Sequence, residues 1–136
     1  MDTKFNFRSA ICTSREQSER LLALGLKKET ADMGYLLCGN EYAEYPLHEI
    51  YKPSWDRDIP AWSLARLVEM MPNTIHNKRI LAYLTIMNDR VSYDTIKNET
   101  YSAFTNNNGL FAAVVDAVEW LIKEGYLNKE YLEEQV

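Results

Sequence analysis

The segment at residues 110–124 constrains the fold most, because its apolar residues repeat with the spacing of an α-helix. Those that fall on one stripe are Phe111, Val114, Val115, Val118, Leu121 and Ile122. Asp116 lies away from the stripe, and Gly125 follows at the position where a left-handed residue ends a helix. Burying the six side chains contributes at most roughly 9 to 18 kcal/mol before chain entropy, at about 1.5 to 3 kcal/mol each. We therefore expect this helix to lie on a sheet.

The residues before this helix carry the pattern of an antiparallel sheet. The segments at 80–87 (ILAYLTIM) and 91–96 (VSYDTI) flank a short turn at 88–90 (NDR). Asn and Asp tolerate the positive φ that a hairpin turn requires, so the three segments together predict a β-hairpin. Alternate residues of the second segment are polar, which indicates that one face of the hairpin is wet. A third strand at 101–105 would complete a meander.

An aromatic segment in the first half of the chain has a different alternation. Between residues 42 and 51, aromatic and β-branched residues alternate with Glu and His in the run YPLHEIY. This pattern predicts a half-buried strand led by Pro46. The residues at 52–60 are charged and contain two prolines, and we interpret them as a loop.

Further helices are predicted on both sides of this strand. Thr13 and Glu16 have the spacing of a capping box, which predicts a helix at 14–24. Apolar residues share one face of a second predicted helix at 61–71, which ends before a proline. A third, short helix is compatible with residues 28–37.

These elements predict an α+β fold in a single domain, residues 1–136. A small antiparallel sheet of three to four strands is covered by the helix at 110–124 and flanked by the helices at 14–24 and 61–71. The length of 136 residues suits one domain, and 46% hydrophobic with 26% charged residues is the balance of an ordinary globular protein. The order of the strands stays open.

Charge and hydropathy limit the partners. The formal net charge of −5 weighs against direct binding to a nucleic-acid backbone, which requires an excess of Lys and Arg on one face. An acidic regulator of nucleic-acid-binding enzymes is an alternative, and it would show an ordered stripe of carboxylates along the last helix. The first residues lack the apolar core of a signal peptide, and no stretch approaches the roughly 18 apolar residues of a membrane span. We expect a cytoplasmic protein that does not bind membranes.

Few residues are arranged for chemistry. His48 and His76 are isolated from other metal ligands, although the carboxylates of residues 56–58 (DRD) could hold Mg²⁺ or else form a self-neutralising loop. Cys12 precedes a predicted helix, whose dipole can lower a thiol pKa, but neither it nor Cys38 has a base nearby in the sequence. The glycines form no phosphate-binding loop. We expect no catalytic residue, no metal and no cofactor.

Aromatic density marks the candidate binding surface, because aromatic residues with polar groups are enriched at interfaces. The candidate residues are Tyr45, His48, Tyr51, Trp55 and Trp62. In the alternative interpretation, Trp62 and some of the tyrosines close one end of the core. A second alternative is a ligand-binding protein or small enzyme with a pocket near His48, Asp56 and Asp58.

A resemblance to a known family lies in three stretches. They are AICTSREQSERLLALGLKKETADM at 10–33, IPAWSLARLVEMMP at 59–72 and DAVEWLIKEGYL at 116–127. They resemble a family of small uncharacterised proteins of gut Bacteroides-type bacteria and their prophages or mobile elements. The resemblance implies a bacterial or phage-associated origin and an accessory role, and it assigns no role to any residue. The chain is therefore expected to be a non-enzymatic protein that binds a protein partner or a second copy of itself through the aromatic segment.

Overall fold

The computed structural model describes residues 10–47 and 53–134. The elements in these ranges are, in order, α1 (Arg15–Ala23), η1 (Lys28–Thr30), β1 (Met33–Cys38), β2 (Glu41–Pro46), β3 (Ile59–Ala61), α2 (Leu64–Met70), β4 (Thr74–Asn77), β5 (Ile80–Ile86), β6 (Val91–Thr95), β7 (Thr100–Phe104), α3 (Leu110–Glu124) and η2 (Lys129–Tyr131). The strands form two antiparallel sheets with the orders β2-β1-β3 and β4-β5-β6-β7. The predicted α+β fold is confirmed, with a second sheet that the sequence did not reveal.

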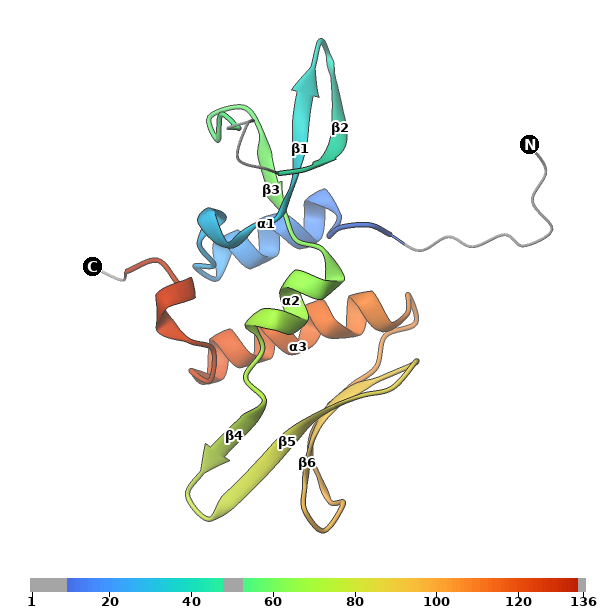
Figure 1. Ribbon diagram of the computed structural model, residues 1–136, viewed down its shortest axis with the longest axis vertical. Coiled ribbons are helices and arrows are strands. Elements are labelled where there is room, and N and C mark those ends of the chain that lie inside the picture. The colour runs from blue at the N-terminus through green and yellow to red at the C-terminus, as the bar shows by residue number, and fades with distance from the viewer. Residues whose placement is uncertain (1–9, 48–52, 135–136) are drawn as a thin grey trace, which may run out of the picture.

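The helices lie between the two sheets (Figure 1). α1 contacts β3 of the smaller sheet, α2 contacts α3, and α3 lies on β6 and β7 of the four-stranded sheet. In the described part of the chain, nothing covers the opposite face of the four-stranded sheet (Figure 1). None of the described helices has the length and apolar character that crossing a membrane requires.

α3 forms over the predicted residues and supplies the centre of the core. Of its predicted stripe, Val114, Val115, Val118 and Leu121 are completely buried, and Phe111 and Ile122 are half-buried. Gly125 ends the helix at φ 79°, in the left-handed region that favours glycine. Trp120 lies outside the predicted stripe and packs among the rings of Tyr93, Tyr101, Phe104 and Tyr126, with centroid distances of 5.4 to 6.3 Å. The helix thus fixes the inner face of the four-stranded sheet.

The predicted hairpin and third strand are confirmed as β5, β6 and β7. Ile86 pairs with Val91 across the turn, and Val91 pairs with Phe104 of β7. β4 adds a fourth strand at one edge, where Thr74 pairs with Tyr83. The sheet therefore has the upper of the two predicted strand numbers.

The helix considered at 28–37 is wrong. Only Lys28–Thr30 is helical, as one 3₁₀ turn, and Met33–Cys38 is the central strand of the smaller sheet. A short apolar run can form either a buried strand or a helix. Here residues 33–38 form a strand because they pair with β2 and β3. A Cβ atom at Gly34 would lie only 3.3 Å from the Leu36 and Leu47 side chains, so this strand position favours glycine.

Three predicted boundaries differ from the structure. The strand predicted between 42 and 51 begins at Glu41 and ends at Pro46, because its pairing with β1 stops there, and residues 48–51 lie outside the described ranges. The helix predicted at 61–71 begins at Leu64, after Ser63 accepts the Arg66 backbone N–H, and Ile59–Ala61 is β3. The capping box of α1 is formed by Ser14 and Gln17 instead of Thr13 and Glu16.

Thr13 is not a cap because its side chain is buried. Its hydroxyl lies 2.8 Å from that of Ser18 and accepts the backbone N–H of Trp62 at 3.1 Å. These bonds attach the start of α1 to the segment between β3 and α2, which are far apart in the sequence. The bond between Thr13 and Trp62 therefore leaves Ser14, and not Thr13, to cap α1.

Candidate functional site

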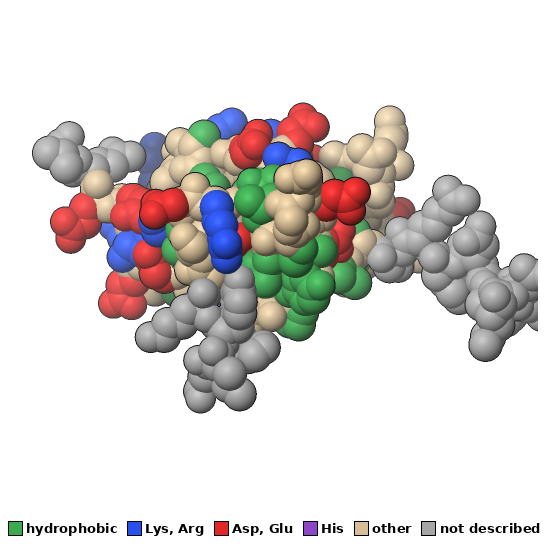
Figure 2. Space-filling view, turned by 90° about the horizontal axis from the view of Figure 1, so that it is seen from above, with side chains coloured by type: hydrophobic (Ala, Val, Ile, Leu, Met, Phe, Trp, Pro, Cys, Tyr) green, Lys and Arg blue, Asp and Glu red, His purple; other side chains and the backbone are tan. Residues whose placement is uncertain are grey.

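The described residues of the aromatic segment that was predicted as a binding surface differ in exposure. Tyr45 is exposed on the edge strand β2, whereas Trp55 is half-buried in a turn. His48 and Tyr51 lie outside the described residues. Figure 2 views the end of the molecule that carries the β1–β2 hairpin and shows hydrophobic side chains gathered on one part of it, beside charged ones. From this segment, Tyr45 is the described residue that places a large hydrophobic side chain in solvent.

Trp62 cannot contribute to an exposed binding surface, because none of its surface reaches solvent. Its indole N–H donates to the Thr30 hydroxyl at 2.9 Å, so its single polar group is satisfied inside the fold. The prediction of a surface role for Trp62 is therefore wrong. Trp62 belongs instead to the main hydrophobic cluster, in agreement with the alternative that it is a core residue.

Asp58 is also a structural residue, so its carboxylate is not free to bind a ligand in the pocket predicted near His48, Asp56 and Asp58. One carboxylate oxygen of Asp58 accepts the Leu37 backbone N–H at 3.0 Å, and the other accepts the Ser54 backbone N–H at 2.9 Å. Its side chain is completely buried, while Asp56 is exposed. Because the two carboxylates occupy different environments, they do not form the predicted Mg²⁺ pair. In the described ranges no three His, Cys, Asp or Glu side chains gather to hold a metal ion.

Cys12 is not an activated nucleophile. Burial raises the pKa of its thiol from about 9 to about 11, and the nearby Glu44 carboxylate, 3.8 Å away, also raises it. Tyr35, whose own pKa is raised by burial, lowers the Cys12 pKa through a side-chain hydrogen bond, but burial has the larger effect. The predicted effect of the α1 dipole on this thiol is therefore outweighed by desolvation.

The two cysteines should differ in reactivity. At about pH 8, a thiol reagent such as 5,5′-dithiobis-(2-nitrobenzoate) should label the exposed Cys38 rapidly and Cys12 slowly, because a raised pKa keeps the buried thiol protonated. Cys12 labelling should accelerate as the pH rises towards about 11. Cys38→Ser should remove the fast phase, whereas Cys12→Ser should keep it. Two equally fast thiols in the folded protein, compared with a urea-unfolded control, would contradict this account.

The carboxylates of α3 do not form the stripe expected of an acidic regulator. Arg20 of α1 donates through Nε to Glu119 at 2.8 Å and pairs through Nη2 with Asp116 at 3.4 Å. The second oxygen of Asp116 accepts the side-chain amide of Asn106 at 2.8 Å. These two acids are therefore used within the fold, and α3 presents its other face to the core.

The exposed apolar residues are concentrated elsewhere, on β5 and the turns beside it. The exposed large hydrophobic side chains of the described residues are Ile11, Tyr45, Ile80, Leu81, Tyr83, Ile86, Met87 and Ile96. All but the first two fall between residues 80 and 96. β5 is apolar on both faces, and α3 covers only one face of the sheet.

We define the outer face as the side of the four-stranded sheet that points away from α3. Tyr93 contacts Trp120 of α3, so its neighbour Asp94 points to the outer face, because successive side chains of a strand alternate. The register places Asp94 opposite Tyr83 on one side and Thr100 on the other. These three side chains therefore form a row across the outer face.

Two charged side chains lie beside each other on the outer face, Asp94 of β6 and Arg90 of the turn that precedes it. Arg90 Nη2 lies 4.0 Å from Asp94 Oδ1, too far for a hydrogen bond, and 3.4 Å from the Thr100 hydroxyl. Asp94 Oδ2 accepts the Ser92 hydroxyl at 3.1 Å. Arg90 Nε and Asp94 Oδ1 are buried and have no hydrogen-bond partner among the described residues. Such unsatisfied groups are unusual in a folded protein and indicate a place where a further partner would be favourable.

The charged pair lies in an open groove of about 620 Å³. The groove is lined by Tyr83, Thr85, Met87, Arg90, Asp94, Thr95, Ile96, Asn98 and Thr100. Ile96 is its most exposed apolar side chain, at 84%. The groove combines an aromatic ring, a methionine, an isoleucine and an arginine with an aspartate and four uncharged polar side chains. Aromatic residues, methionine and arginine are enriched at protein interfaces.

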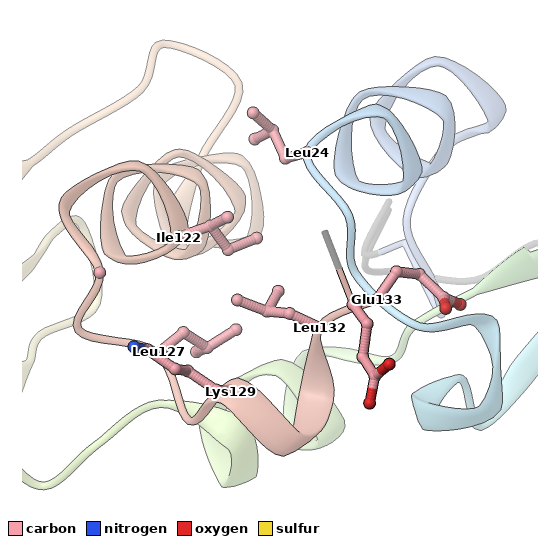
Figure 3. A pocket seen from close by; sticks show the side chains of 8 residues that line it. Leu24, Ile122, Leu127, Lys129, Leu132 and Glu133 are labelled. Atoms are coloured by element: carbon pink, nitrogen blue, oxygen red, sulfur yellow. The ribbon is translucent and has the colours of Figure 1, made fainter. Parts of the chain in front are cut away.

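A second pocket of about 600 Å³ lies at the carboxyl end of α3 (Figure 3). The side chains of Leu24, Ile122, Leu127 and Leu132 converge on it from three segments of the chain. The last segment is held there because the Glu133 backbone N–H donates to the Gly25 carbonyl at 2.7 Å. The polar side chains lining this pocket, Lys129, Glu133 and Glu134, are all exposed. It therefore offers apolar surface without buried polar groups to orient a reacting molecule.

Comparison of the chain with protein-family models, with curated proteins and with solved structures found no match. The support for the candidate site therefore comes from the geometry of this chain alone.

Sequence reasoning missed Tyr83, Arg90 and Asp94, although one signal was present. In ILAYLTIM, odd-numbered and even-numbered positions both carry apolar residues, which is unexpected for a strand with one face in solvent. Such a strand requires a cover on both faces. The sequence alone could not show that α3 covers only one of them.

Proposed function

We propose that this protein is a non-enzymatic interaction protein that binds a protein partner through the outer face of its four-stranded sheet. The observation that carries the proposal is the groove in which the exposed Tyr83, Met87 and Ile96 lie beside the incompletely bonded Arg90 and Asp94. Exposed apolar side chains are normal when scattered singly, but a contiguous group around a polar centre is typical of an interaction site. The outer face thus replaces the aromatic segment at 42–62 as the proposed binding surface.

An enzymatic role has less support from the described residues. Catalysis requires a nucleophile or base that converges with other polar groups in one pocket. Cys12 is held as a protonated thiol, and Asp58 is occupied by two backbone N–H groups. A pocket at His48 remains an alternative on residues outside the described ranges.

The accessory role and the cytoplasmic location remain parts of this proposal. The family resemblance of the stretches at 10–33, 59–72 and 116–127 supports an accessory role in bacteria or their mobile elements. The acidic-regulator alternative is less supported, because Asp116 and Glu119 are paired with Arg20.

Two tyrosines of nearly equal exposure allow the proposed surface to be tested against the aromatic segment. Tyr83 is 43% exposed on the outer face and Tyr45 is 45% exposed on β2. Tyr83→Ser is expected to abolish or strongly weaken capture of the protein's partner from the cells that encode it, since interface aromatic residues carry much of the binding energy. Tyr45→Ser, the matched control, should leave capture unchanged.

The readout is the amount of each partner recovered with tagged wild type and variants, quantified by mass spectrometry. Equal thermal stability of the two variants would show that both are folded. Partners that depend on Tyr45 and are indifferent to Tyr83 would overturn the proposed surface and restore the aromatic segment.

A further inference from the structure

We infer that the occupant of the outer face is a second copy of this chain, so that the protein forms a two-fold symmetric dimer with the sheets packed face to face. This inference rests on the proposed function, because it names the partner of the same surface. Such a dimer is isologous: the outer face of one copy contacts the outer face of the other across the two-fold axis.

The charges of the patch are self-complementary. Arg90 and Asp94 lie side by side on the outer face, and each has an atom with no hydrogen-bond partner among the described residues. Arg90 Nε is a hydrogen-bond donor and Asp94 Oδ1 is an acceptor. The outer face can therefore take one acceptor and one donor from its partner. A partner with only acidic or only basic groups would satisfy one of the two and repel the other. A second copy satisfies both.

A two-fold axis provides the geometry. The nearest charged atoms of Arg90 and Asp94 are 4.0 Å apart. A two-fold axis that runs between the two sheets, parallel to them and perpendicular to the line from Arg90 to Asp94, places the partner's Asp94 over Arg90 and the partner's Arg90 over Asp94. The side chains are 35% and 20% exposed. Because Arg90 Nε and Asp94 Oδ1 are covered in the monomer, the side chains rotate towards the partner as they pair. Both long side chains have the torsional freedom for this rotation.

The charge of the surrounding segment permits self-association. The chain has a net charge of −5, which opposes contact between two copies. Residues 78–100, which build β5, β6 and their turns, contain four Lys and Arg and three Asp and Glu, so this segment is +1 and the remainder of the chain is −6. Contact through this segment therefore avoids the repulsion that the remainder would cause.

The apolar residues supply the attractive surface around the charged pair. Tyr83 lies next to Asp94 in the register, and Met87 and Ile96 border the same groove. Two sheets that pack face to face lie about 10 Å apart. Side chains of the size of tyrosine, methionine and isoleucine, contributed by both copies, can fill the space between them. The dimer would thus bury the exposed apolar face that α3 leaves uncovered.

Charge reversal tests the two-fold pairing directly. Arg90→Glu makes both members of the charged pair acidic, and Asp94→Lys makes both basic. Each variant alone brings like charges together across the axis, so its dimerisation should weaken at least about a hundredfold. An equimolar mixture of the two should restore a dimer, because every contact then joins opposite charges. Analytical ultracentrifugation of the wild type, of each variant and of the mixture measures these masses.

Circular dichroism and thermal unfolding identify any variant that fails to fold. In that event Arg90→Gln and Asp94→Asn replace the reversals, and each should weaken the dimer without restoration on mixing. A wild type that stays monomeric at every concentration, or reversal variants that stay dimeric, would overturn the inference.

The outcome separates this inference from the proposed function. A monomeric wild type whose other partner is lost with Tyr83→Ser and kept with Tyr45→Ser overturns the dimer and leaves the outer face as the binding surface. A dimer that dissociates with Tyr45→Ser and persists with Tyr83→Ser overturns both.

Discussion

Replacing Trp62 with alanine should lower the free energy of unfolding by about 3 to 5 kcal/mol, a large part of the roughly 5 to 15 kcal/mol that stabilises a domain. Trp62 is fully buried in the main core cluster, so the change leaves a cavity that its neighbours cannot fill. It also leaves the Thr30 hydroxyl without the indole N–H that it accepts. Urea unfolding followed by circular dichroism measures the loss.

Trp55→Ala provides the control, because Trp55 is half-buried in the turn that follows the undescribed segment. Its loss should be clearly smaller, about 1 kcal/mol. If the two substitutions destabilised the protein equally, or if Trp55 mattered more, the assignment of Trp62 to the core would be wrong.

Removing the Asp58 carboxylate should be the second most damaging change, with an expected loss of about 1 to 3 kcal/mol for Asp58→Ala. The Leu37 backbone N–H of β1 and the Ser54 backbone N–H of the following turn lose their acceptor together. The carboxylate holds the turn at 55–57 against the central strand of the smaller sheet, so the turn should also loosen. Thermal unfolding and amide hydrogen exchange at Leu37 measure both effects.

Asp56→Ala is the matched control, since Asp56 is exposed two residues away. Its effect should stay within about 0.5 kcal/mol. Mg²⁺ should shift the melting temperature of neither the wild type nor the variants. A Mg²⁺-dependent stabilisation that both substitutions abolish would restore the predicted metal pair and contradict the structural role of Asp58.

Some parts of the fold could be predicted because their signals are local and long. The stripe at 110–124 repeats over four turns, so no other periodicity competes with it. The hairpin of β5 and β6 is indicated by its turn at 88–90 and by alternation in β6. Both elements form where the sequence places them.

The missed elements depend on contacts between distant residues. In Met33–Cys38 the sequence is apolar without a clear period, and only pairing with β2 and β3 makes it a strand. Thr13 and Ser14 are equally good caps by type, and the bond from Thr13 to the Trp62 backbone decides between them. Local spacing contains none of this information.

The candidate site was missed for a related reason. Aromatic density at 42–62 does not distinguish Trp62, which is buried, from Tyr45, which is exposed. The outer face is defined by which side of the sheet α3 covers, a property of the packed fold. The exposed position of Tyr83 therefore follows from tertiary structure.

The most direct test of the outer face as the self-association surface is a comparison of backbone amide NMR spectra of the wild-type protein at low and at high concentration. We predict that shifts and line broadening on concentration are confined to the four-stranded sheet, with the largest changes at Tyr83, Arg90 and Asp94. Changes centred on Tyr45 and Trp55 would contradict this account, and so would spectra that do not depend on concentration.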